Sequence, residues 1–160
     1  MILQETFVLE DLLYYNAELT KTFSSSSTTY ENIVDLGSVL DCEITATINA
    51  TDVHGLALIY KKENNANNTY YVRAGCGGGT EYNGAIFKSS AVSDHNGSVA
   101  SANTDFSVKI KVSNGKVSIV SGNYTLTDYS VTGIDARYVG LFNWNRSKTI
   151  TVKNLKVKAL

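Results

Sequence analysis

Residues that could carry out acid–base or metal chemistry are few in this chain and form no known catalytic pattern. The two histidines, His54 and His95, both lie beside turn residues. Histidines in such loops are more often solvated than catalytic. Neither has a zinc-type spacing to Cys42 or Cys76. We therefore predict no metal site and no catalytic histidine.

Hydrolase and nucleotide motifs are also missing. Retaining glycosidases place two carboxyl groups about 5 Å apart, but Glu10 and Asp11 are adjacent and would point to opposite faces of a strand. The glycine run 75–79 lacks the Lys-Ser/Thr ending of a phosphate loop. No Gly-x-Ser-x-Gly motif provides a serine nucleophile. The chain is therefore not expected to be an enzyme.

Aromatic and amide side chains are stronger candidates, and they suggest binding. Sugars are recognised by flat aromatic faces together with polar side chains that fix orientation. The segment 143–146 supplies both kinds just after an expected strand end and contains the single tryptophan, which could instead fill the core. Alternation places two residues of segment 70–73 on one strand face, and a loop residue near 82 could close over that surface. The predicted ligand-binding residues are Tyr71, Arg73, Tyr82, Asn143, Trp144 and Asn145.

Strands must position these residues, because much of the chain alternates between apolar and polar side chains. Segment 42–49 is apolar at every second position, and 106–112 repeats the pattern. Asn114-Gly115 then predicts a hairpin to the run 116–121. Segment 149–160 alternates in two halves separated by a local break. The predicted core contains Ile44, Ile48, Leu56, Leu58, Val72, Phe106, Val108, Ile110, Leu141, Ile150, Val152 and Leu155.

The order of the strands suggests simple local pairing in the first half of the chain. We predict a three-stranded meander from strands near 42–49, 55–61 and 70–75, which would keep the two cysteines apart and unpaired. Later, 84–88 should be a strand and 89–104 a long polar loop. The beginning is less regular: 5–15 is expected to be an opening edge segment, 24–29 a loop and 33–36 a short strand.

Length and charge narrow the class further. The 160 residues fit one domain spanning 1–160, in which 1–37 is the least defined part. The net charge of −1 gives no basic field to attract nucleic acid. No apolar run approaches the roughly 20 residues needed to cross a bilayer. We therefore expect neither a nucleic-acid partner nor membrane insertion.

Several segments resemble a known superfamily. An apolar strand after a glycine, 55–60, is followed by an Asn-rich turn and a Tyr-Tyr strand within 67–73. The chain then closes with Tyr138-Val139-Gly140-Leu141-Phe142 and the Asn-Leu-x-Val run of 152–157. In order and spacing, residues 38–160 resemble concanavalin A-like lectin/glucanase modules, including laminin-G-like and keto-disaccharide hydrolase-like domains.

The resemblance implies an all-β, jelly-roll sandwich of two antiparallel sheets with adjacent terminal strands. It does not imply glucanase activity, because the Glu-x-Asp-x-x-Glu signature of that branch is absent and Asp41-Cys42-Glu43 lacks the third acid. Calcium is frequent in the superfamily, but the sequence identifies no ligands for it. No cofactor is therefore predicted, and calcium held by loop carbonyls and Asp side chains is left open as an alternative.

The leading functional hypothesis is a non-enzymatic carbohydrate-recognition module. Its partner would be a glycan or host-surface polysaccharide, and its location extracellular, on a cell-surface adhesin or on a virion as part of a phage tail fibre or capsid appendage. One alternative is a structural or assembly module of a virion or surface protein, acting as a homo-oligomer. Another is a glycan-active enzyme that uses a tyrosine or histidine base.

Overall fold

The computed structural model describes residues 11–24, 29–39, 41–51, 56–61, 71–74, 82–88, 90–96, 101–131, 136–143 and 147–160. All elements within these ranges are β-strands. They are β1 (Leu12–Phe23), β2 (Thr29–Val39), β3 (Cys42–Ala50), β4 (Leu56–Lys61), β5 (Tyr71–Ala74), β6 (Tyr82–Lys88), β7 (Ser90–Asn96), β8 (Phe106–Ser113), β9 (Lys116–Ser121), β10 (Tyr124–Ser130), β11 (Ala136–Asn143) and β12 (Lys148–Ala159).

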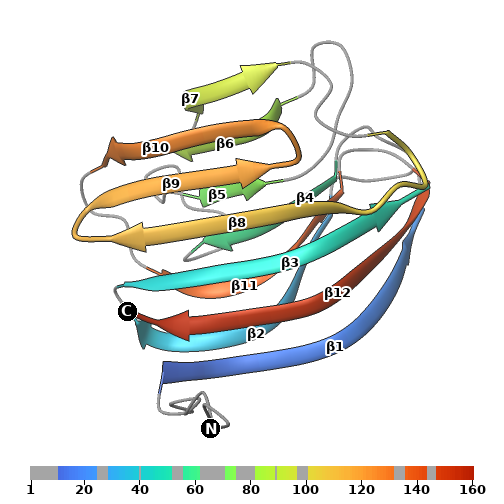
Figure 1. The fold of residues 1–160 in the computed structure, drawn as a ribbon, viewed down its shortest axis with the longest axis horizontal. Coiled ribbons are helices and arrows are strands. Elements are labelled where there is room, and N and C mark those ends of the chain that lie inside the picture. Colours follow the sequence, from blue (N-terminus) through green and yellow to red (C-terminus); the bar gives the residue numbers. More distant parts are fainter. Residues whose placement is uncertain are drawn as a thin grey trace, which may run out of the picture.

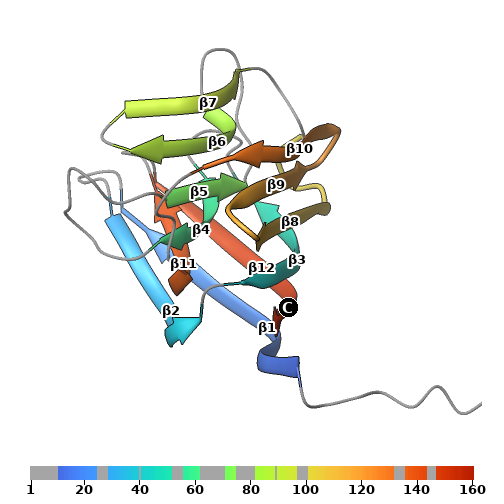
Figure 2. The ribbon, with the colours of Figure 1, turned by 90° about the vertical axis from the view of Figure 1, so that its left-hand side faces the viewer.

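The strands form two six-stranded antiparallel sheets that pack face to face, as predicted. Sheet A has the order β1-β12-β3-β8-β9-β10, and sheet B has the order β2-β11-β4-β5-β6-β7. Figure 1 shows sheet A in front of sheet B, and Figure 2 shows the two layers from the side. The terminal strands β1 and β12 are neighbours in sheet A, which confirms the expected closure.

The core lies between the sheets and follows the alternation of the sequence. In β3 and β8 every second side chain is buried, including Ile44, Ile48 and Ile110, each 0% exposed. Sheet B contributes Val72, Ile86 and Leu141 to the same cluster. Of the predicted core residues, those whose side chains the structure describes are all buried; the side chains of Leu56 and Leu58 lie outside the described part.

Two local irregularities occur where the sequence predicts them. Asn114 and Gly115 both have positive φ, 52° and 71°, as the tight turn between β8 and β9 requires. In β12 the pairing with β3 shifts between Lys153 and Lys156, and Asn154 has a φ of 50°. This β-bulge is the predicted break, and it keeps both Val152 and Leu155 in the core.

The predicted meander of the first half is wrong. β3 pairs with β12 and β8 in sheet A, whereas β4 and β5 pair with each other in sheet B. The chain crosses from one sheet to the other after β3, because a jelly roll joins strands of opposite layers as well as neighbours. Alternation marks a strand but does not show which strand it pairs with.

Other boundaries also differ from the sequence-based expectation. The segment predicted as a loop, 89–104, contains β7, which pairs with β6. β2 spans Thr29–Val39 rather than four residues, and β10 was not predicted. Polar strands such as β7 and β10 lie at sheet edges, where water solvates one side and strict apolar alternation is not required.

The structure describes only one of the two cysteines. Cys42, at the start of β3, is 0% exposed, as expected, whereas Cys76 lies outside the described residues. The prediction that the thiols are unpaired therefore stays a prediction. No helix in the described part of the chain is long and apolar enough to span a membrane.

Candidate functional site

The outer face of sheet A, which points away from the core, carries a row of polar side chains. Because alternate residues of β3 and β8 are buried, the residues between them face solvent. A groove of about 420 Å³ opens on this face. We call it the outer groove; its lining contains Thr45, Ala46, Thr47, Ser107, Val108, Lys109, Val120, Asn154 and Lys156.

Strand register places the groove residues in continuous cross-strand rows. On β12, Lys156 is opposite both Tyr15 of β1 and Thr45 of β3. Thr45 in turn faces Lys109 of β8, which faces Val120 of β9. Directly opposed residues on adjacent strands share one face of a sheet. The first row is therefore aromatic, cationic, hydroxyl, cationic and aliphatic in that order.

The second row adds further hydroxyl groups beside the first. Lys153 of β12 faces Thr47 of β3, and Thr47 faces Ser107 of β8. Thr47 and Ser107 line the groove, so its floor presents small hydroxyl side chains between the strands. Short side chains between longer lysines leave the space that forms the groove.

The β12 bulge shapes one wall of the groove. Asn154 adopts a left-handed conformation, which asparagine tolerates better than most residues. This conformation turns its side chain outward, where the Tyr15 hydroxyl donates a hydrogen bond of 3.3 Å to Asn154 Oδ1. Tyr15 is 48% exposed, so its ring remains available beside the groove.

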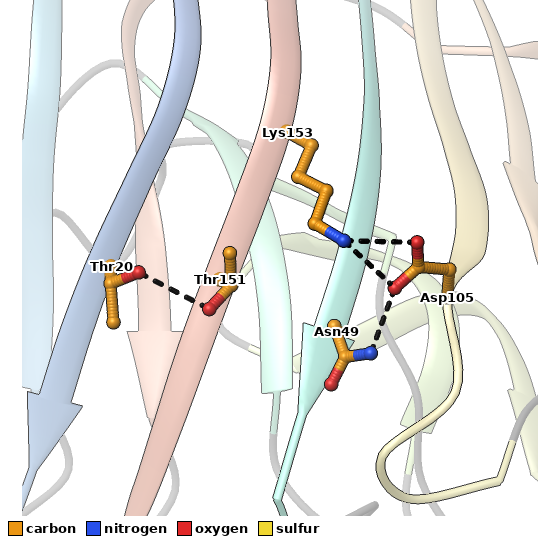
Figure 3. Close-up of polar contacts among 5 residues, drawn as sticks. All are labelled: Thr20, Asn49, Asp105, Thr151 and Lys153. Atoms are coloured by element: carbon orange, nitrogen blue, oxygen red, sulfur yellow. Dashed lines mark hydrogen bonds and ion pairs between the residues drawn. The ribbon is translucent and has the colours of Figure 1, made fainter.

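A charged cluster follows the second row toward the beginning of β8. Lys153 Nζ lies 3.1 Å from Asp105 Oδ2, and Asn49 Nδ2 donates a 2.8 Å hydrogen bond to Asp105 Oδ1 (Figure 3). The amide of Asn49 and then the ammonium of Lys153 lower the pKa of Asp105 below its ordinary value of 3.8. Asp105 therefore stays ionised and neutralises Lys153.

A threonine ladder joins β1 and β12 beyond this cluster. The hydroxyls of Thr20 and Thr151 are 3.2 Å apart, and those of Thr22 and Thr149 are 3.0 Å apart. Figure 3 shows the first pair beside the Asp105 cluster. These exposed hydroxyls extend the polar surface from the groove along the two terminal strands.

This arrangement can bind a polar molecule through the hydroxyl, amide and ammonium groups of its lining. Threonine, serine, asparagine and lysine donate or accept hydrogen bonds, and no carboxylate is among the lining residues named above. In the described part of the chain, no three His, Cys, Asp or Glu side chains come together as a metal site would require.

Of the residues predicted from the sequence, Tyr71, Arg73, Tyr82 and Asn143 belong to strands of the other sheet. Arg73, in the middle of β5, faces Ile59 of β4 and Ala85 of β6 in register. Its face is opposite that of Val72 and Ala74, which belong to the core. Arg73 is nevertheless only 2% exposed. Its guanidinium is therefore buried rather than exposed to solvent.

The strand register places the other predicted strand residues at two different ends of sheet B. Tyr71 faces Lys61 at one end of β4, whereas Asn143 faces Leu56 at the other end. Tyr82 was expected on a loop but begins β6, toward the same end as Asn143. The side chains of Tyr71, Tyr82 and Asn143, and the whole of Trp144 and Asn145, lie outside the described part. Their ligand-binding role stays a prediction.

The sequence reasoning missed the outer groove, although part of its signal was present. Alternation already places Thr45, Thr47, Ser107 and Lys109 on the solvent side of their strands. What alternation does not show is that β12 lies beside β3, which brings Lys156 and Asn154 to the same surface. Pairing between distant segments was the missing information.

Comparisons with known proteins support the fold. No family model and no curated protein sequence matches the chain. Among solved structures, it is similar to carbohydrate binding module CBM66 from Bacillus subtilis, with a TM-score of 0.61, 12% identity, and coverage of 90% of this chain and 96% of that one. It is also similar to the VIP36 exoplasmic/lumenal domain in its Ca2+/Man3GlcNAc-bound form, with a TM-score of 0.55, 11% identity, and coverage of 91% and 83%.

A third similar structure is a glycosyl hydrolase candidate from Parabacteroides distasonis ATCC 8503, with a TM-score of 0.57, 12% identity, and coverage of 95% of this chain and 91% of that one. At these identities the similarity concerns the fold. The chain shares the β-sandwich fold of these structures, as the resemblance noted in the sequence predicted.

Proposed function

We propose that this chain is a non-enzymatic carbohydrate-binding module and that the outer groove of sheet A is a binding surface. The observation that carries the proposal is the groove itself, about 420 Å³ in volume and lined by hydroxyl, amide and ammonium groups. Sugars present many hydroxyl groups, which such side chains can bind, and Tyr15 supplies an aromatic face beside them. The similarity in fold to a carbohydrate binding module and to VIP36 supports the same class of ligand.

A glycan array tests this function directly. We expect the wild-type chain to bind at least one glycan, with millimolar to micromolar affinity, about −4 to −8 kcal/mol. The double variant Thr45→Val/Thr47→Val removes two groove hydroxyls while keeping side-chain shape and strand propensity, so it should bind more weakly. Thr22→Val, which removes an exposed hydroxyl of the same face outside the groove, is the matched control. Binding of no glycan at all would refute the function.

The residues predicted from the sequence remain a proposal for a second binding surface on sheet B. In that proposal Tyr71, Tyr82, Asn143, Trp144 and Asn145 contact the ligand. Since Arg73 is buried, we propose that it contributes by positioning neighbouring groups. Binding that survives loss of the groove hydroxyls would favour this second surface.

We also propose that the module acts outside the cell, on a cell-surface adhesin or on a virion, with a host-surface polysaccharide as partner. The support is the fold, which it shares with the exoplasmic/lumenal domain of VIP36. Imaging with an antibody against the chain would test the location. Labelling confined to the cell interior would contradict it.

A glycan-active enzyme is the second candidate function. The observation in its favour is the similarity in fold to the glycosyl hydrolase candidate. Incubating the chain with each glycan that it binds and analysing the products distinguishes the two functions. Cleaved products would establish an enzyme, and unchanged glycans would support a binding module.

A further inference from the structure

The charge of the outer groove differs from that of the whole chain. The net charge of the protein is −1, yet lysines predominate on the outer surface of the central strands of sheet A. On and beside β12, β3 and β8 the outward-facing lysines are Lys109, Lys111, Lys153, Lys156 and Lys158, against Glu18, Glu43 and Asp105. The strands that enclose the groove therefore form a local cationic surface.

The two lysines that line the groove are only weakly neutralised by their described neighbours. Lys156 makes no ion pair with any described residue, and its cross-strand neighbours Tyr15 and Thr45 are uncharged. Lys109 has one carboxylate partner, Glu43, at a distance of 3.9 Å, and the Lys109 side chain is 46% exposed. An exposed pair at this distance is weak. Lys153, by contrast, is held by Asp105 at 3.1 Å.

Strand register sets the distance between the backbones of the two groove lysines. Lys156 and Lys109 face Thr45 from opposite sides, and adjacent strands are about 4.8 Å apart. The two lysine backbones are therefore separated by roughly 10 Å, with the hydroxyls of Thr45, Thr47 and Ser107 between or beside them. A ligand lying across the strands would meet a cation, hydroxyl groups and a second cation in succession.

We propose that the outer groove selects acidic glycans, whose carboxylate or sulfate groups bind Lys156 and Lys109 while a sugar ring packs against Tyr15. This inference rests on the proposed function and names the ligand class. The hydroxyl and amide groups favour a sugar, because they can form hydrogen bonds with its many hydroxyl groups while the lysines bind its acidic group. The exposed ring of Tyr15 favours the same choice, since it offers a flat face for sugar C–H groups.

The test compares two forms of one polymer, polygalacturonate and its methyl ester, which share a backbone and differ in charge. Wild-type protein should bind polygalacturonate more tightly, and raising the salt concentration should weaken that binding. The double variant Lys109→Gln/Lys156→Gln should lose about tenfold or more in affinity for polygalacturonate, because charge-assisted hydrogen bonds are lost. Lys116→Gln removes the same kind of charge at the exposed start of β9 and should have no such effect.

Each other outcome overturns the inference in a distinguishable way. Equal binding of the polymer and its ester would leave the carbohydrate-binding function standing and refute the acidic preference. Failure to bind either polymer, with binding to neutral glycans on the array, would do the same. Equally tight binding of a double-stranded DNA would show a non-selective cationic surface. A melting temperature unchanged by the lysine substitutions shows that any loss is not due to unfolding.

Discussion

Lys153 and Asp105 form an ion pair across the width of strand β3. Lys153 belongs to β12 and Asp105 precedes β8, and β3 lies between these two strands in sheet A. Their charged atoms nevertheless approach to 3.1 Å above Asn49 of β3, which donates its own hydrogen bond to Asp105 (Figure 3). The contact joins three neighbouring strands on the outer face.

This contact predicts a dependence of stability on pH. The pKa of Asp105 lies below 3.8 in the folded chain, so the stabilisation by its ionised form is present above that value and is lost as the pH falls through the lower, folded-state pKa. Asp105→Asn should therefore be less stable than wild type at neutral pH, and the difference should shrink in strong acid. Urea unfolding at several pH values measures it. A difference that is constant with pH would contradict the ion pair.

The same carboxyl group provides a sharper test of its partners. The hydrogen bond from Asn49 is the largest single cause of the lowered pKa, and Lys153 lowers it both by a hydrogen bond and by its charge. Asn49→Ala and Lys153→Gln should therefore each raise the pKa of Asp105 toward 3.8. An NMR titration of the carboxyl carbon measures each value. A pKa unchanged by either substitution would mean that the removed group does not act on Asp105.

The central apolar residue of β8 tests the strand register. Ile110 is 0% exposed, so Ile110→Ala should lower the free energy of unfolding by about 2 to 5 kcal/mol through lost burial and a residual cavity. Lys111→Ala, the next residue on the opposite and exposed face, should change it by less than about 0.5 kcal/mol. Chemical denaturation of both variants compares them. Equal effects would mean that the register is wrong.

The bulge in β12 makes a distinct prediction. Asn154 has a φ of 50°, a conformation that costs a β-branched residue roughly 1 to 2 kcal/mol more. Asn154→Val should therefore destabilise the domain and also remove the hydrogen bond from Tyr15. Asn154→Gly relieves the backbone strain but loses the same hydrogen bond. A melting temperature lower for Val than for Gly supports the strained bulge, and equal values argue against it.

Trp144 allows a test of the surface predicted from the sequence. If it contacts a glycan, Trp144→Ala should abolish binding and leave the melting temperature nearly unchanged. If it fills the core instead, the substitution should cost roughly 3 to 5 kcal/mol of stability. Calorimetric binding and thermal melting of the single variant separate these roles. Binding equal to that of wild type would exclude Trp144 from the site.

Much of this fold follows from local sequence. Alternation identifies the buried side chains of β3, β8 and β12, because successive strand residues point to opposite faces whatever the partner strand. Asn114-Gly115 identifies the hairpin, because that turn needs two residues with positive φ. Even the bulge is visible, since the apolar alternation of β12 changes phase between Val152 and Leu155.

The candidate site depends on tertiary structure instead. Lys156 and Lys109 are far apart in sequence, and they share a groove only because β12 and β8 both pair with β3. The local alternation shows that both lysines face solvent, but it does not show that they line the same groove. Which strands become neighbours is decided by closing both sheets over a common core. That choice depends on long-range packing, so the sequence determined the regular strands such as β3, β8 and β12 and their buried faces, and only the folded chain determined the groove.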